Sequence, residues 1–147
     1  MKFVPDASVT MTWCFEDEKT ELTEGLLEAL ADGAEAMVPG IWVHEVANAV
    51  AGALRRGRIT GAAGASFIED VQGLPIQVDG EGERRVFEAV FQVACQHGLT
   101  VYDAAYLELA MRRGLPLATL DERLERAARE AGVEVVGAGE ERHRGRG

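Results

Sequence analysis

Four acidic residues in this chain stand where they could act together on one cation or one substrate. Three are aspartates at the entrances to predicted helices, and the fourth is a glutamate beside the apolar stripe of a helix: Asp6, Asp103, Asp121 and Glu45. Carboxylates that share one cleft repel each other and take up protons unless cations are present. A set of oxygen ligands without histidine or cysteine suits Mg²⁺ or Mn²⁺. The chemistry that such a cluster would serve is the attack of water on a phosphodiester.

Each acid also has an explanation that involves no chemistry. Aspartate is a favoured N-cap, because its side chain accepts a hydrogen bond from a free amide in the first helical turn. In "TVYDAAYLELA", residues 100–110, we expect Asp103 to open a helix in this way. Glu45 stands next to Val46 in an apolar stripe, so its stem can pack while its carboxylate stays in water. Caps would account for three aspartates separately but not for the glutamate.

The elements that must position these acids follow an alternating order. Short apolar runs alternate with stretches of helical period, which is typical of an α/β layer fold with a mostly parallel sheet. Asp6 and Asp121 each follow a predicted strand directly, and in such sheets ligands bind beyond the carboxyl ends of the strands. The pattern predicts strands at 2–6, 35–40, 75–79, 115–120 and 133–137, and helices at 8–15, 18–33, 41–57, 59–74, 82–98, 103–114 and 121–132.

Composition limits the classes of protein to consider. A chain of 147 residues that is 47% hydrophobic has the size of one domain with its own core. The formal net charge is -10, and the acidity is concentrated in residues 1–54, where Lys2 and Lys19 are the only basic residues. This argues against a protein that binds nucleic acid by broad phosphate neutralisation, although not against one that uses metal ions. Local arginine clusters, such as Arg112 with Arg113, are interpreted as solvated faces.

The cellular location is predicted from two kinds of segment that the sequence lacks, a signal peptide and a membrane-spanning run. The N-terminus reaches Asp6 too early for a signal peptide, and no apolar run is long enough to cross a bilayer, so we expect a cytoplasmic protein without membrane contact. Cys14 and Cys95 form no zinc spacing with the histidines and are interpreted as reduced thiols.

Three stretches taken together resemble the PIN-domain ribonuclease toxins of the VapC type. They are "FVPDASVTMTWCFEDE", "VPGIWVHEVANAVAGALRRGRIT" and "TVYDAAYLELAMRRGLPLATLDERL", and the resemblance covers nearly the whole chain. It implies a PIN-like three-layer α/β/α sandwich over residues 1–139, with a central, mostly parallel sheet of 4–5 strands, followed by a flexible Arg/Gly-rich tail at 140–147. Pro5 departs from the family, which commonly has an aliphatic residue there, and this questions how the end of the first strand pairs.

The resemblance also implies roles for individual residues. The acids Asp6, Glu45, Asp103 and Asp121 would hold Mg²⁺ or Mn²⁺. Thr119 matches the hydroxyl that precedes the last aspartate, while Ser8 and Asn48 match polar positions that support metal ligands or bound water. Ser8 could instead form a local turn and Asn48 could be an exposed helix amide, and these alternatives stay open.

The activity implied by the resemblance is hydrolysis of single-stranded or loop RNA, leaving a 5′-phosphate and a 3′-hydroxyl. Rim arginines would contact the RNA: Arg55, Arg56 and Arg58. The family further implies a cognate VapB-type antitoxin and a homodimer, for which exposed apolar residues in 12–15 or on the helix from Thr60 could serve.

Two other classes of function remain as alternatives. One is a catalytically silent PIN-like module that binds a protein or RNA and keeps its acids only as caps. The other is a phosphatase with Asp6 as nucleophile, which the sequence disfavours because no second aspartate follows two residues later and no lysine stands near the last strands.

Overall fold

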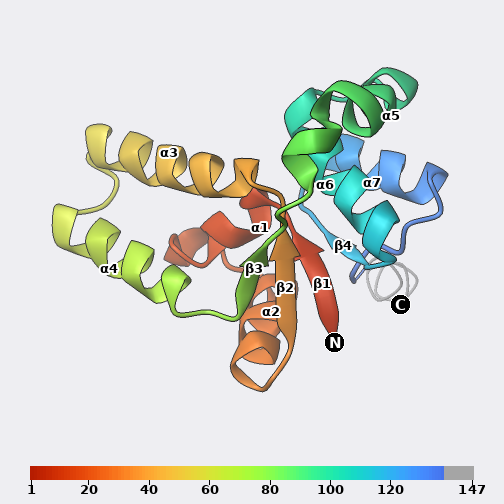
Figure 1. The fold of residues 1–147 in the computed structure, drawn as a ribbon. Coiled ribbons are helices and arrows are strands. Elements are labelled where there is room, and N and C mark those ends of the chain that lie inside the picture. The colour runs from red at the N-terminus through yellow and green to blue at the C-terminus, as the bar shows by residue number, and fades with distance from the viewer. Residues whose placement is uncertain (138–147) are drawn as a thin grey trace.

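A parallel sheet forms the centre of the computed structural model, which describes residues 1–137 (Figure 1). Within this range the sheet has four strands in the order β3-β2-β1-β4, and every neighbouring pair is parallel. The predicted parallel sheet is therefore confirmed, and the carboxyl ends of β1 and β4 are adjacent. The strands are β1 (Lys2–Pro5), β2 (Glu35–Val38), β3 (Ile76–Val78) and β4 (Leu117–Ala118).

Helices cover both faces of the sheet and complete the predicted three-layer α/β/α architecture (Figure 1). In one group, α1 packs against α2 and α3, and α3 packs against α4. In the other, α6 packs against α5, α7 and β1. The helices of the first group are α1 (Ala7–Thr12), α2 (Glu21–Ala31), α3 (Ile41–Arg55) and α4 (Gly61–Gln72), with the short η1 (Glu16–Glu18); those of the second are η2 (Gly82–Arg85), η3 (Val86–Val90), α5 (Phe91–His97), α6 (Val101–Arg113) and α7 (Glu122–Glu130).

Pro5 fits the first strand because its missing amide is not required there. The amides on either side of it, those of Val4 and Asp6, donate to carbonyls of the β4 segment, at 2.9 and 3.0 Å. Pairing of β1 with β2 covers only Lys2 and Phe3. The strand therefore switches partners along its length, and Pro5 lies where no ladder bond would form on its side.

Of the three aspartates that the sequence predicts as N-caps, two are N-caps in the structure. Asp6 caps α1 and Asp121 caps α7, each accepting a hydrogen bond from an amide in the first turn. The third expectation was wrong, because α6 begins at Val101 and its cap is Thr100, whose hydroxyl accepts from the amide of Asp103. Asp103 therefore lies inside the first turn, and its carboxylate is not used as the N-cap.

Two predicted elements are less regular than expected. Residues 82–98 form a 3₁₀ turn, then a π-helical turn, and only then the α-helix α5. The side chain of Asp79 accepts a hydrogen bond from the amide of Glu81, and this tight turn shapes the start of the segment. In place of a strand at 133–137, the described residues show one bridge between Leu117 and Val135. Gly137, the last described residue, has a φ of 82°.

The segment 12–15 belongs to the core and not to the surface. Trp13 and Phe15 are buried, and the indole of Trp13 donates a hydrogen bond to the carbonyl of Thr23. On α4, Phe67 and Val71 are also buried. The expectation of exposed apolar surface is therefore wrong for the two rings of residues 12–15, whereas the exposed apolar side chains of α4 are only the small ones of Ala62, Ala63 and Ala65.

No helix within residues 1–137 is both long enough and apolar enough to span a membrane. The predicted Arg/Gly-rich tail at 140–147, and with it the expected boundary at 139, lies outside the described residues.

Candidate functional site

Two of the predicted acids meet where β1 and β4 end side by side. The hydroxyl of Thr119 donates a hydrogen bond to Oδ2 of Asp6 and accepts one from the backbone amide of Asp121, at 3.0 Å. Thr119 therefore joins the acid that follows β1 to the acid that follows β4. A hydroxyl that holds two acids in this way is compatible with the supporting role that the family resemblance implies for Thr119.

Asp6 is held on its other oxygen as well. Its Oδ1 accepts hydrogen bonds from the hydroxyl of Ser8, at 2.5 Å, and from the amide of Val9, at 3.1 Å. The hydroxyl of Ser8 also accepts a hydrogen bond from the amide of Leu120, so Ser8 joins α1 to the segment that follows β4. Asp6 is only 5% exposed, and a buried carboxylate with this many donors has a fixed orientation.

Glu45 reaches the same region from α3. It is half-buried, and the phenol of Tyr106 on α6 donates a hydrogen bond to its Oε1, at 2.6 Å. One turn earlier on α3, the indole of Trp42 donates to the hydroxyl of Thr10 on α1. Both contacts fix the first turns of α3 against the elements that carry the other acids.

The charges of these acids act on one another. Burial raises the pKa of Asp6, and the nearby charge of Asp103 raises it further, against the opposing effect of its hydrogen bonds. Burial likewise raises the pKa of Glu45, with further contributions from the charges of Asp103 and Asp6. A carboxylate whose pKa is raised by other carboxylates lies within their electrostatic reach.

Asp103 connects the remaining acid to this group. Burial raises its pKa, the charge of Asp121 adds to the effect, and Arg123 opposes it. Through Asp103 all four predicted acids are electrostatically coupled, although they come from four different segments. Arg123, an exposed residue of α7, is the arginine that acts on this site.

The donor set fits a hard divalent cation in its chemistry. All four acids supply oxygen, and a bound cation would offset the burial and repulsion that raise the pKa of three of them. Among residues 1–137, no three acidic, histidine or cysteine side chains are already gathered as ligands of one ion. The residues therefore match Mg²⁺ or Mn²⁺ in type, and the described part of the chain shows no closed ligand shell.

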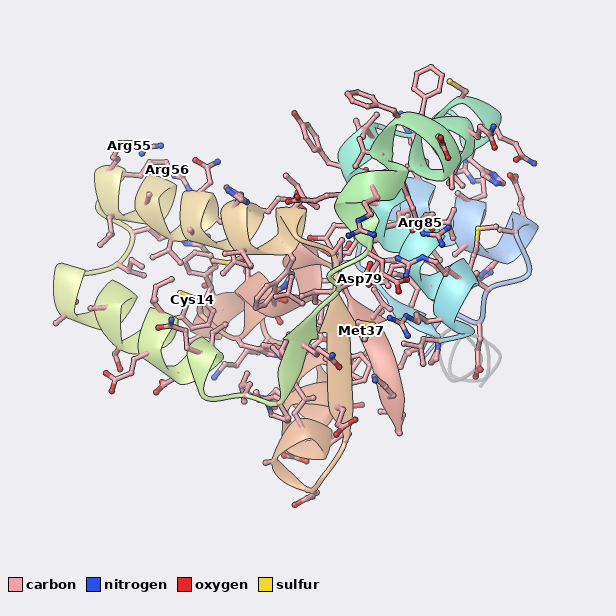
Figure 2. The ribbon with its side chains drawn as sticks, in the orientation of Figure 1. Cys14, Met37, Arg55, Arg56, Asp79 and Arg85 are labelled. Atoms are coloured by element: carbon pink, nitrogen blue, oxygen red, sulfur yellow. The ribbon has the colours of Figure 1, made fainter. Side chains whose placement is uncertain are left out.

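The other residues of the predicted site lie on α3 or shortly after it. Asn48 is exposed on α3. Arg55 and Arg56 project from the end of α3 that points away from the sheet (Figure 2), and ten residues of helix, about 15 Å, separate Arg55 from Glu45. Arg58 stacks over the ring of Phe15, at 3.8 Å from its centroid, and it also forms ion pairs with acids of η1. Arg55 and Arg56 therefore lie away from the four acids, and Arg58 is engaged by Phe15 and η1.

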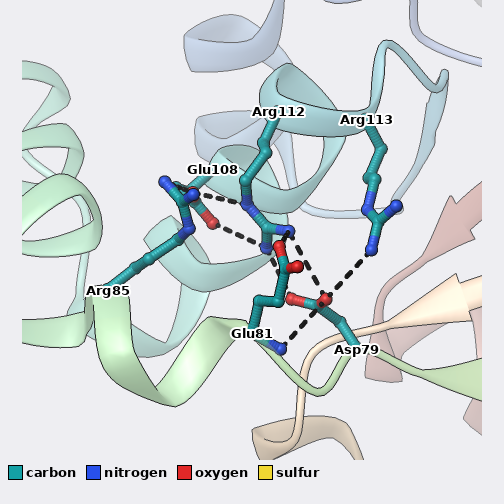
Figure 3. A network of polar contacts seen from close by, with 6 residues as sticks. All are labelled: Asp79, Glu81, Arg85, Glu108, Arg112 and Arg113. Carbon is teal, nitrogen blue, oxygen red and sulfur yellow. Dashed lines mark hydrogen bonds and ion pairs between the residues drawn. The ribbon is translucent and has the colours of Figure 1, made fainter.

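A polar network that the sequence did not predict clamps the segment after β3 onto α6 (Figure 3). Arg112 is its centre: it pairs with Asp79, with Glu108 and with Glu81. Arg113 reaches Asp79 and Arg85 reaches Glu108 at longer distances, 3.7 and 3.8 Å. Asp79 and Glu108 are each 5% exposed, so the interpretation of Arg112 as part of a solvated face was wrong.

Sequence reasoning also missed Tyr106, although a signal was present. Tyr106 follows Asp103 by three residues, so the two share a face of α6. A tyrosine in an otherwise apolar helix face usually brings its hydroxyl to a buried partner. Here burial and the adjacent Glu45 raise the pKa of Tyr106, so the phenol stays protonated and acts as the donor.

Comparison with known proteins bears on the family and the fold of this chain. The family model of the PIN domain matches residues 3–130. Ribonuclease VapC3 of Pyrobaculum aerophilum is 32% identical over 124 residues, which are 84% of this chain and 92% of that protein. The structure of VapBC2 from Rickettsia felis bound to a DNA fragment from their promoter superposes with a TM-score of 0.62 at 13% identity, covering 92% of this chain and 97% of that chain. A toxin–antitoxin complex from Klebsiella pneumoniae superposes with a TM-score of 0.58 at 15% identity, covering 81% and 86%.

Proposed function

This chain belongs to the PIN-domain family, as a relative of the VapC ribonucleases, and we propose that it is a metal-dependent endoribonuclease toxin. Its reaction would be the hydrolysis of phosphodiester bonds in single-stranded or loop RNA, leaving a 5′-phosphate and a 3′-hydroxyl. The observation that carries this proposal is geometric. Thr119 joins Asp6 to Asp121 where β1 and β4 end, and Tyr106, on the helix that bears Asp103, holds Glu45.

In this proposal the four acids would hold Mg²⁺ or Mn²⁺, which lowers the pKa of the attacking water and neutralises charge on the phosphate. The rest of the chain fixes those acids. Thr119 and Ser8 hold the two oxygens of Asp6, so that carboxylate keeps one orientation. Thr100 caps α6 and accepts the amide of Asp103, so the carboxylate of Asp103 is not needed as the N-cap. No side-chain nucleophile is needed for attack by water.

RNA has to approach a site that is strongly acidic. Arg123 is the cation that acts on Asp103, and we propose that it contacts a phosphate next to the scissile bond. Arg55 and Arg56 would bind RNA farther along α3. Arg58 would contribute less, because it already pairs with Asp17 and Glu18.

A cognate VapB-type antitoxin is the proposed protein partner. The Klebsiella pneumoniae neighbour is described as a toxin–antitoxin complex, and it shares this fold. A guanidinium group from a basic partner could pair with two of the four carboxylates and compete with the metal. The acidic first third of the chain would complement such a partner.

We also propose a homodimer in the cytoplasm. Large apolar side chains are exposed on α3, η3, α5 and α6, namely Val43, Phe87, Phe91 and Tyr102, with Phe87 93% exposed. An exposed apolar surface of this kind is a common site of protein association. Both cysteines are free thiols, which suits a reducing compartment.

The test of the activity is cleavage of a panel of transfer, ribosomal and messenger RNA with Mg²⁺, Mn²⁺ or EDTA. Wild type is compared with Asp103→Asn, which keeps the size of the side chain but removes its charge. The backbone amide of Asp103, and not its carboxylate, serves the helix cap, so the variant should fold. We expect metal-dependent cleavage by wild type and none by the variant.

If no RNA is cut under any metal condition, the ribonuclease proposal fails. The alternative, a PIN-like module that only binds a protein or RNA, would then account for the shared fold and for binding without turnover. Equal cleavage by wild type and by Asp103→Asn would instead remove Asp103 from the catalytic set.

A further inference from the structure

The phenol of Tyr106 is a buried polar group whose partner lies on another helix. Its side chain is 1% exposed, and its hydroxyl donates to Oε1 of Glu45 at 2.6 Å. The bond joins α6 to α3, which belong to the two helix groups on opposite sides of the sheet. The group that accepts its proton is therefore a carboxylate of the four-acid site, while the backbone amide of Ala7 also donates to the phenol oxygen.

Packing alone does not require a hydroxyl at this position. A phenylalanine would fill the same volume, and a buried hydroxyl lowers stability unless it is hydrogen-bonded. Oε2 of Glu45 accepts no hydrogen bond from any described residue, so the phenol fixes one oxygen and leaves the other available. Such an arrangement orients a carboxylate for a ligand.

The backbone of Glu45 is fixed independently of its side chain. Trp42 precedes it by three residues on α3 and donates to the hydroxyl of Thr10 at 2.9 Å. That hydroxyl donates in turn to the carbonyl of Asp6 at 3.1 Å. The first turn of α3 is thus tied to the residue that carries another acid, and the freedom that remains is in the Glu45 side chain, which Tyr106 restrains.

We propose that Tyr106 is a positioning residue that holds Oε1 of Glu45 and so presents Oε2 to the divalent cation. This rests on the proposed metal-dependent function. A glutamate has several side-chain torsions, and fixing them before the ion binds removes part of the entropic cost of binding. Partners of this kind, one step behind a metal ligand, typically change metal affinity about 10- to 100-fold.

The direct test is Mn²⁺ binding to the full chain without RNA, measured by titration calorimetry for wild type and Tyr106→Phe. We expect the dissociation constant to rise about 10- to 100-fold in Tyr106→Phe. Tyr102→Phe is the matched control, because it removes an exposed phenol from the same helix, and it should bind Mn²⁺ as wild type does. RNA cleavage by Tyr106→Phe should recover at high Mn²⁺, with the KM for RNA unchanged.

A double-mutant cycle separates positioning from a general structural effect. If Tyr106 acts through Glu45, then Tyr106→Phe should not weaken Mn²⁺ binding further in a Glu45→Ala background. An equal loss in both backgrounds, or an unchanged dissociation constant in folded Tyr106→Phe, would overturn the proposal. If Tyr106→Phe does not fold, amide hydrogen exchange of the wild type with and without Mg²⁺ tests the proposal instead. Mg²⁺ should protect the amides around Glu45 and those around Tyr106 together. Protection around Tyr106 alone would contradict the proposal.

The same measurements distinguish failure of this inference from failure of the ribonuclease proposal. Metal binding that depends on Tyr106, in a protein that cuts no RNA, would support the positioning role and refute the activity. Metal-dependent cleavage, together with the same Mn²⁺ dissociation constant in wild type and in Tyr106→Phe, would refute the positioning role alone.

Discussion

Thr119 and Asp6 are 113 residues apart in the chain, and the hydroxyl of one is hydrogen-bonded to the carboxylate of the other. The same hydroxyl accepts the amide of Asp121, so one small side chain holds both strand ends at the edge of the sheet. A threonine is suited to this place because its hydroxyl can donate and accept at once. Thr119 is itself buried, with 6% of its surface exposed.

Thr119→Val tests that double role. Valine has nearly the same shape, but it leaves a buried carboxylate oxygen of Asp6 and the amide of Asp121 without their partner. We expect a loss of about 1–3 kcal/mol in the free energy of unfolding and of about 10- to 100-fold in metal affinity. Urea denaturation and Mn²⁺ titration measure the two effects. Thr119→Ser keeps the hydroxyl and should restore most of the affinity; if it does not, the methyl group matters more than the hydrogen bonds.

Asp103→Asn should stabilise the metal-free protein. Burial and the charge of Asp121 raise the pKa of Asp103 in the folded chain. Below its ordinary value, about 3.9, the carboxyl is protonated in both folded and unfolded chains and carries no penalty. As the pH rises through the raised pKa, the folded state bears the cost of the charge and the stability of wild type falls. The variant should therefore melt at a higher temperature than wild type at pH 7, with the difference vanishing toward pH 3.

The control for that experiment is an exposed aspartate. Asp70→Asn on α4 removes one negative charge far from the four acids, and the melting curves of this variant should follow wild type at every pH. Added Mg²⁺ should raise the melting temperature of wild type and of Asp70→Asn, and much less that of Asp103→Asn. If Asp103→Asn is less stable than wild type at pH 7 in EDTA, the repulsion described for the site is not significant.

The network of Figure 3 predicts a large effect for Arg112→Met. This change leaves Asp79 and Glu108 buried without their main cation, and breaking such a pair costs about 3–5 kcal/mol. Arg113→Met, whose side chain is 43% exposed and makes one ion pair of 3.7 Å, should cost far less. Chemical denaturation compares the two. Similar losses for both variants would show that Arg112 is not the centre of the network.

The same network has a defined pH dependence. Burial alone would raise the pKa of Asp79, but the hydrogen bonds from Arg112 and from the Glu81 amide outweigh it, and the net pKa is lowered. The stability that Asp79 contributes is thus complete above its ordinary value, about 3.9, and is lost as the pH falls through the lowered pKa. In Arg112→Met this dependence should disappear or reverse, which unfolding free energies between pH 2 and pH 5 would reveal.

Replacing different surface arginines should change the affinity for RNA, and its salt dependence, to different extents. Replacing Arg55 and Arg56 together by glutamine should weaken binding of a single-stranded RNA and reduce its salt slope by about 0.7 for each phosphate that is no longer neutralised. Arg58→Gln should lower the melting temperature, because it removes the ion pairs with η1 and the stacking on Phe15, and change the salt slope less. Filter binding across a salt series measures both; equal slopes for all three proteins would exclude α3 as an RNA-binding surface.

Self-association should depend on the exposed aromatic residues of the second helix group. A double change, Phe87→Ser with Phe91→Ser, removes two rings that are 93% and 54% exposed and that stand one turn apart. Light scattering should show a dimer for wild type and a monomer for this variant, with the melting temperature of the monomer nearly unchanged. A variant that stays dimeric would place the interface elsewhere.

Local rules in the sequence predicted most of the fold. Gly57 ends one helix and Thr60 begins the next as expected, and Asp6 and Asp121 are caps that also follow strands. The start of α6 was misjudged because Thr100 and Asp103 can both cap a helix, and only the backbone decides which one does. The irregular turns of residues 82–90 depend on contacts with Asp79 and α6, which the local pattern does not contain.

The candidate site was predictable to the extent that its residues follow strands or share a helix face. Asp6, Asp121 and Thr119 adjoin β1 and β4, so the parallel sheet alone brings them together. Tyr106 shares a face of α6 with Asp103 but finds its partner 61 residues away, a pairing that no short stretch of sequence reveals. The burial of Arg112 could not be read from a run of charges at a helix end, since that depends on which loop packs above it.

The order of strands also determines when this protein becomes able to react. A ribosome makes the chain from its N-terminus, so Asp6 and Glu45 exist while Asp103 and Asp121 are still to be translated. β1 can pair with β2 early, but the edge that will receive β4 stays open until late in synthesis. A nascent chain therefore carries only two of the four acids of the proposed site. If all four are needed, translation leaves an interval in which a partner can bind before the site is complete.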